Sequence, residues 1–127
     1  MNKRGLALYI HVPFCIRKCL YCDFISSAAS EETIDKYFAA LNNEAASYTD
    51  RMDDYAVSSI YIGGGTPSAV DCHYIADILD RISRVFSIED DAEISIEVNP
   101  GTADKEKFDL YRRAGINRMS IGLQSAS

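Results

Sequence analysis

Apolar and polar residues alternate along the first stretch of the chain, residues 6–12. Side chains of a β-strand point alternately to two faces, so this period of two predicts a strand. The same alternation predicts strands over residues 57–62, 93–99 and 117–124. Proline cannot donate a backbone hydrogen bond, so Pro13 should end the first strand.

Between successive strands, apolar residues recur at the spacing of a helix. The first helix should begin near Glu31 and Glu32, whose charges suit a helix N-terminus. We expect Ser68 and Thr102 to cap the second and third helices, and Gly115 to end the third. The residues expected on the buried helix faces are Ile34, Tyr37, Phe38, Leu41, Ala45, Tyr48, Ile75, Ile78, Leu79, Ile82, Val85, Phe86, Phe108 and Tyr111.

The resulting order, β-α-β-α-β-α-β, predicts an α/β fold with a parallel sheet and helical crossovers. Each predicted strand has one apolar face and one partly polar face, whereas a sheet covered on both sides should be apolar on both. A curved barrel wall resolves this, with helices outside and a polar cavity near the carboxyl ends of the strands. The residues expected to point into that cavity are Tyr9, His11, Tyr61, Glu97, Asn99 and Gln124.

Three cysteines, Cys15, Cys19 and Cys22, follow the first strand in the order C-x3-C-x2-C. A closed structural zinc site takes four protein ligands, and an ordinary iron–sulfur cluster takes four cysteines. Three thiolates in one loop therefore favour a 4Fe–4S cluster with one iron open to another ligand. Arg17 and Lys18 would favour thiolates and an anionic cluster there, or they are simply solvated charges.

Two other interpretations of the cysteines stay open. A zinc site could take a fourth ligand from His11, Cys72 or His73, although the last two, at the start of a helix, are expected to be structural. A disulfide pair with one odd thiol is the other alternative.

Gly63, Gly64 and Gly65 stand between the second strand and the second helix, followed by Thr66. Glycines let a ligand approach the backbone closely and leave amide groups unshielded, although a plain tight turn explains them equally well. The lysine of a phosphate-binding P-loop is lacking.

The composition favours one folded domain, with 127 residues of which 47% are apolar and 25% charged. The net charge of −6 argues against a general nucleic-acid or membrane surface. No apolar run reaches the roughly 18 residues of a membrane span. We interpret the N-terminus as mature cytoplasmic sequence, in a reducing compartment that keeps thiols free for metal.

Four segments together resemble the oxygen-independent coproporphyrinogen III oxidase-like family of the radical S-adenosylmethionine (SAM) superfamily. They are YIHVPFC-x3-C-x2-C, GGGTP, ISIEVNP and NRMSIGLQS. The resemblance implies the N-terminal portion, about four βα units, of a partial (β/α)6 TIM-like barrel. Residues 1–127 would then be an incomplete radical SAM core domain at the start of a longer protein. Four strands cannot close a barrel and would leave an exposed edge.

The resemblance also implies roles for individual residues. In that family a 4Fe–4S cluster, held here by Cys15, Cys19 and Cys22, reduces SAM to give a 5′-deoxyadenosyl radical, with electrons from a donor such as flavodoxin or ferredoxin. The implied SAM contacts are Tyr9 and Tyr21 near the cluster, Gly64, Gly65 and Thr66 at the methionine amino end, Glu97 at the ribose hydroxyls, and Gln124 completing the wall.

One departure from the family's pattern concerns the reaction. The true oxidases resemble C-x3-C-x2-C-x-C, but Phe24 stands at the position of the last cysteine. This resembles the haem chaperone branch, which binds haem and passes it to an acceptor protein. Porphyrinogen decarboxylation by an oxidoreductase and a zinc-bound structural module are the alternative functions.

Overall fold

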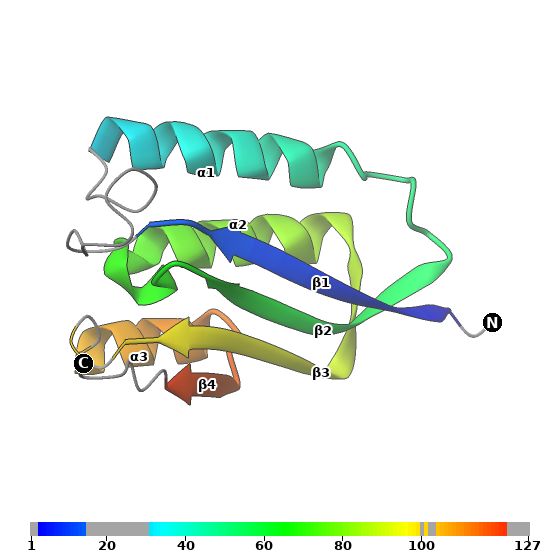
Figure 1. The fold of residues 1–127 in the computed structure, drawn as a ribbon. Helices are drawn as coiled ribbons and strands as arrows, with labels where there is room; N and C mark the ends of the chain where they lie inside the picture. The colour runs from blue at the N-terminus through cyan, green and yellow to red at the C-terminus, as the bar shows by residue number, and fades with distance from the viewer. Residues whose placement is uncertain (1–2, 15–30, 100, 102–103, 122–127) are drawn as a thin grey trace.

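The computed structural model describes residues 3–14, 31–99, 101 and 104–121. In this part of the chain, strands and α-helices alternate as the sequence predicts (Figure 1). In chain order they are β1 (Arg4–Val12), α1 (Glu31–Ala46), β2 (Tyr55–Gly64), the 3-10 turn η1 (Pro67–Ala69), α2 (Cys72–Val85), β3 (Ser87–Val98), α3 (Lys105–Arg113) and β4 (Arg118–Ile121).

The described strands form one parallel sheet in the order β1-β2-β3-β4. Each strand pairs with the next in the sequence, so every connection passes over the sheet to the adjacent position. Because the strands are parallel, all their carboxyl ends lie at one end of the sheet, where the arrowheads gather in Figure 1. This confirms the predicted α/β class.

One face of the sheet packs against the helices and the other is open. Ile10, Ile62 and Ile96 point to the helix side and are almost fully buried. Tyr9, which alternates with Ile10, is 59% exposed on the opposite face. The predicted helix faces are confirmed as well, since Phe38 of α1 and Tyr111 of α3 are buried in the core. The polar face is therefore an open wall rather than an enclosed cavity.

Two predicted helix caps are wrong. The carboxylate of Asp71, not Ser68, caps α2 by accepting a hydrogen bond from His73 N at 3.0 Å. Ser68 lies in η1 and is fully buried, and its hydroxyl accepts from Asn99 N instead. The side chain of Asp104, not Thr102, caps α3. Before α2 the chain makes the extra turn η1, which moves the cap three residues on from Ser68. The cap of α3 lies two residues beyond Thr102, which is outside the described residues.

The end of α3 follows the prediction, because Gly115 has φ +109° just after the helix. The start of β3 differs from the prediction, because the strand begins at Ser87 rather than near residue 93. Between Val57 and Ser59 of β2, the partner residue on β3 moves from Ile88 to Glu93. The exposed acidic residues of this irregularity interrupt the alternation that marks a strand in the sequence.

Candidate functional site

The predicted site residues that the structure describes gather at the carboxyl ends of the strands. Tyr9 of β1 and Tyr61 of β2 are register partners on the open face. Their rings stack with centroids 6.0 Å apart and planes 12° from parallel. The hydroxyl of Tyr9 lies 3.4 Å from His11 Nδ1. Strands β1 and β2 thus supply a flat aromatic surface beside a histidine.

Glu97, near the end of β3, belongs to the same face. Its Oε1 accepts a hydrogen bond from Gly64 N at 2.9 Å, which ties β3 to the glycine loop after β2. Glu97 is also the register partner of Ser120 on β4. The structure therefore brings Tyr9, Tyr61, Glu97 and the glycine loop together, as the sequence predicts.

Burial, together with a hydrogen bond to the Glu97 carboxylate, raises the pKa of the Tyr61 phenol. A carboxylate that accepts the phenolic hydrogen stabilises the protonated phenol, so Tyr61 remains a donor at neutral pH. The Ser120 hydroxyl acts in the opposite direction, because a hydrogen bond from it favours the phenolate. Sequence reasoning assigned neither contact. The strand register, which places Ser120 beside Glu97, is the signal that would have found the second.

The backbone amides of the glycine loop are not unshielded, contrary to the sequence-based expectation. Gly64 N donates to Glu97, Gly65 N donates to Val12 O at 2.9 Å, and Thr66 N donates to Phe14 O at 2.7 Å. The loop thus pairs with the chain that leaves β1. The resemblance implies that this loop receives the amino group of the methionine part of SAM. That amino group is itself a donor and needs acceptors, which backbone carbonyls and the Thr66 hydroxyl can supply.

The five remaining predicted site residues lie outside the described residues. They are Cys15, Cys19, Cys22, Tyr21 and Gln124. Phe14, which directly precedes the first cysteine, is described, and its carbonyl accepts from Thr66 N. Its ring packs edge-on against Tyr37 of α1 at 5.3 Å. The entry to the cysteine segment is therefore fixed beside the glycine loop.

Asn99 is used differently from the expectation that it lines a cavity. Its Oδ1 accepts from Gly101 N at 2.8 Å, and its backbone N donates to the buried Ser68 hydroxyl. The residue closes the turn after β3 and links it to η1.

The residues considered as extra zinc ligands do not form a cluster in the described part of the chain, where no group of three or more metal-binding side chains is found. His73 pairs with Asp71 at 2.9 Å, at the start of α2. Burial raises the pKa of the neighbouring Cys72 thiol, which disfavours the thiolate that binds metal. This supports the structural interpretation of both residues.

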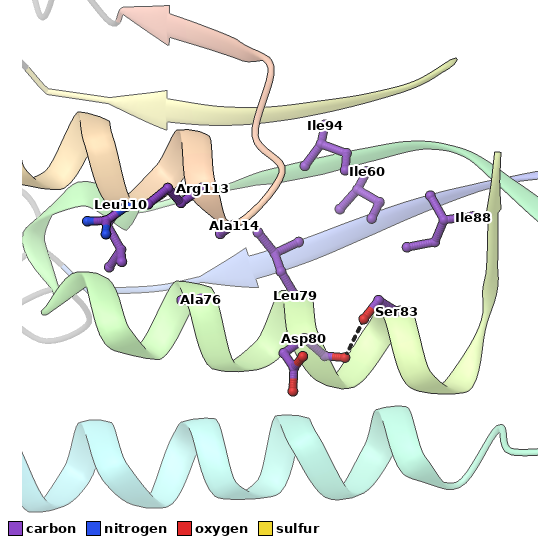
Figure 2. A pocket seen from close by; sticks show the side chains of 10 residues that line it. All are labelled: Ile60, Ala76, Leu79, Asp80, Ser83, Ile88, Ile94, Leu110, Arg113 and Ala114. Carbon is purple, nitrogen blue, oxygen red and sulfur yellow. Dashed lines mark hydrogen bonds between the residues drawn. The ribbon is translucent and has the colours of Figure 1, made fainter. Parts of the chain in front are cut away.

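A cavity of about 330 Å³ lies elsewhere, between α2, α3 and the helix-covered face of the sheet. Figure 2 shows apolar side chains such as Ile60, Leu79 and Ile94 on its walls, with Asp80 and Arg113 among the polar ones. None of the predicted site residues lines it. We therefore assign the candidate site to the open face and not to this cavity.

Known proteins share the sequence that forms this open face. Residues 9–127 match the radical SAM superfamily. The chain belongs to the radical SAM superfamily. This match includes the three cysteines, the glycine loop and Glu97. The part of the chain that the structure describes contains no helix long and apolar enough to cross a membrane.

Within the superfamily, the chain is similar to proteins named heme chaperone HemW. It is 43% identical to that of Escherichia coli over 96% of this chain and 32% of the relative. It is 37% identical to that of Mycobacterium tuberculosis (strain H37Rv) over all of this chain and 33% of the relative. The chain spans about a third of the length of these curated relatives.

A solved structure is also similar. Coproporphyrinogen III oxidase (HemN) from Escherichia coli, described as a radical SAM enzyme, matches with a TM-score of 0.86 and 32% identity. The match covers 98% of this chain and 29% of the oxidase. The predicted resemblance, in family and in fold, is confirmed.

Proposed function

We propose that this protein is a haem chaperone-like radical SAM protein, with a 4Fe–4S cluster on Cys15, Cys19 and Cys22. The observation that carries the proposal is the pairing of the glycine loop with the end of β1 through Gly65 and Thr66. It holds Phe14, the residue before Cys15, beside the glycine loop, whose Gly64 N donates to Glu97. A cofactor that bridges a cluster and a carboxylate needs this arrangement.

The residues of this open face fit the chemistry of SAM. The Glu97 carboxylate accepts hydrogen bonds and suits a ribose diol. Tyr9 offers an exposed aromatic surface on the same face. Tyr21 and Gln124 are further predicted contacts. When bound, the cluster and SAM supply the radical chemistry, while the protein binds, orients and shields them.

Anaerobic reconstitution tests the cluster. Three thiolates hold the cluster, so Cys19→Ala should lose most bound iron and sulfide and the brown charge-transfer absorbance. Cys72→Ala is the matched control, because Cys72 begins α2 and is not one of the three proposed ligands, so this variant should keep the cluster. A Cys19→Ala variant that assembles the same cluster contradicts the proposal. Zinc in place of iron in the wild-type protein would instead support the zinc-bound structural module.

Haem transfer is the finer part of the proposal. The relatives are named heme chaperones, which supports haem or a porphyrin as ligand and a haem-acceptor protein as partner. The cytoplasm is the proposed location. An electron donor such as flavodoxin or ferredoxin would serve the cluster. Titration with haemin, followed by transfer to an apo-haemoprotein, tests this part.

Oxidative decarboxylation of coproporphyrinogen III is the second candidate function. The similarity to the oxidase structure favours it, while Phe24 at the position of a further cysteine disfavours it. We expect the reconstituted protein to form no protoporphyrinogen when supplied with SAM, reductant and coproporphyrinogen III. Sustained turnover in that assay would replace the chaperone proposal with the oxidase.

A further inference from the structure

The space around Gly63 is already filled by two side chains. Gly63 is not among the glycines with positive φ, so its backbone alone does not require glycine. A Cβ built there would lie 2.6 Å from Glu97 Oε1 and 2.8 Å from Tyr61 Cε1. The missing side chain is what lets Glu97 and Tyr61 meet above the strand.

Glu97 is held from two sides in this space. Gly64 N donates to its Oε1 at 2.9 Å. The Tyr61 ring on the neighbouring strand lies beside the same oxygen in the space at Gly63, which places its phenol to donate to the carboxylate. A carboxylate with fixed donors keeps one orientation, whereas a free glutamate side chain samples many rotamers.

Tyr61 is itself fixed. Its ring stacks on Tyr9, the register partner on β1. An offset aromatic stack restricts the ring, and therefore also the direction of the phenolic hydroxyl. Tyr9, Tyr61 and Glu97 thus form a connected row across β1, β2 and β3.

We propose that Tyr61 is a positioning residue that orients the Glu97 carboxylate toward the ribose hydroxyls of SAM. The inference rests on the proposed function, because it takes Glu97 as the ribose contact. Tyr61 acts through Glu97 and through the stack on Tyr9, so it need not touch the cofactor itself. The phenolic hydroxyl orients Glu97, and the ring stack on Tyr9 holds that hydroxyl in place.

Tyr61→Phe separates the two, since phenylalanine keeps the ring stack and loses the hydroxyl. The measurement is equilibrium binding of SAM and of its 2′-deoxy analogue to the anaerobically reconstituted protein. We expect Tyr61→Phe to bind SAM about tenfold more weakly, the scale of one hydrogen bond to a charged group. The preference for SAM over the analogue should shrink with it. Cluster content should stay unchanged.

Two further variants sharpen the test. In a Glu97→Gln background, Tyr61→Phe should cause little additional loss, because the carboxylate it orients is gone. Tyr55→Phe is the matched control, since it removes a phenol at the opposite end of the same strand and should leave binding unchanged. Should Tyr61→Phe fold poorly, Gly63→Ala provides a second test, because its Cβ would push Glu97 and Tyr61 apart while the phenolic hydroxyl is retained, and it should weaken SAM binding. Gly5→Ala, which meets only ordinary contacts, is its control.

The outcomes separate the two levels of the argument. If the wild-type protein binds SAM and Tyr61→Phe binds it equally well, the positioning role is overturned and the proposed function stands. An equal loss from Tyr61→Phe with and without Glu97→Gln also overturns it. If the wild-type protein with its cluster binds no SAM, the proposed function fails, and the inference fails with it.

Discussion

At the scale of single residues, the three glycines at the end of β2 are required for three different reasons. Gly63 leaves room for Glu97 and Tyr61, as described above. Gly64 has φ +124°, and a Cβ there would also lie 2.8 Å from His11 Nδ1. At Gly65 a Cβ would lie 2.8 Å from the carbonyl oxygen of Phe14. A glycine run that looks like a ligand loop in the sequence is thus equally a packing requirement of the chain itself.

Asp71 gives a prediction at this scale. Its carboxylate caps α2, and the hydrogen bond from His73 N is the main reason that the pKa of Asp71 is lowered. Asp71→Ala should lower the free energy of unfolding by about 1 kcal/mol, as expected for loss of an N-cap. Asp71→Asn, which keeps the acceptor, should lose less.

The charge adds a pH dependence with a definite sign. A lowered pKa means that the ionised form stabilises the fold above the unfolded-state pKa of about 3.9, and that this contribution is lost as the pH falls through the folded-state value. Urea unfolding of wild type and Asp71→Asn between about pH 7 and 3 should show the difference closing in acid. A constant difference would mean that the charge contributes nothing.

At the scale of elements, tyrosines join α1 to the rest of the molecule. Tyr37 of α1 donates to the carbonyl of His11 at the end of β1. Tyr74 of α2 donates to Asp35 of α1 and stacks on Phe38 at 4.8 Å. Helical periodicity predicts that Tyr37 and Phe38 face the core, but it does not single out Tyr74 or show that the tyrosine hydroxyls connect one element to the next.

Tyr74→Phe tests the link between α1 and α2. The hydrogen bond to Asp35, with burial, raises the pKa of Tyr74 to about 12. A raised pKa means that the protonated phenol stabilises the fold fully below the unfolded value of about 10, and that this is lost as the pH rises toward the folded value. Wild type should therefore have a higher urea midpoint than Tyr74→Phe at neutral pH. The gap should narrow above about pH 10.

Asp35→Asn provides the control for the comparison of wild type with Tyr74→Phe. Asp35→Asn removes the charged acceptor, so Tyr74→Phe should have a smaller effect in that background. The other tyrosines are present in both proteins, so their contributions cancel in the difference. A gap of constant size across the pH range would show that the phenol of Tyr74 adds nothing beyond its ring.

At the scale of the whole molecule, the sequence predicts the order of elements and the two faces of the sheet, because alternation and helical spacing report burial directly. Ile60 and Tyr61 are on the faces expected. The sequence does not predict contacts between strands. The bond from Gly64 N to Glu97 joins residues 33 apart, and the cap at Asp71 depends on the turn η1, which no periodicity marks.

The edge of the sheet gives the last prediction. β4 pairs with β3, and no described strand pairs with its other side. Ile121 on β4 is 58% exposed. An exposed strand edge with an apolar side chain promotes edge-to-edge association, and a lysine there opposes it. The 127-residue chain should therefore self-associate with rising concentration in size-exclusion chromatography, and Ile121→Lys should shift it toward monomer.

Asn43→Lys supplies the matched control, since it adds the same charge on the exposed surface of α1, away from the edge. Its association should equal that of the wild-type chain. Because Ile121 is largely exposed, Ile121→Lys should change the free energy of unfolding by no more than about 0.5 kcal/mol. If both lysine variants reduce association equally, net charge and not the edge of β4 controls it. If neither does, the edge is not the contact through which the chains meet.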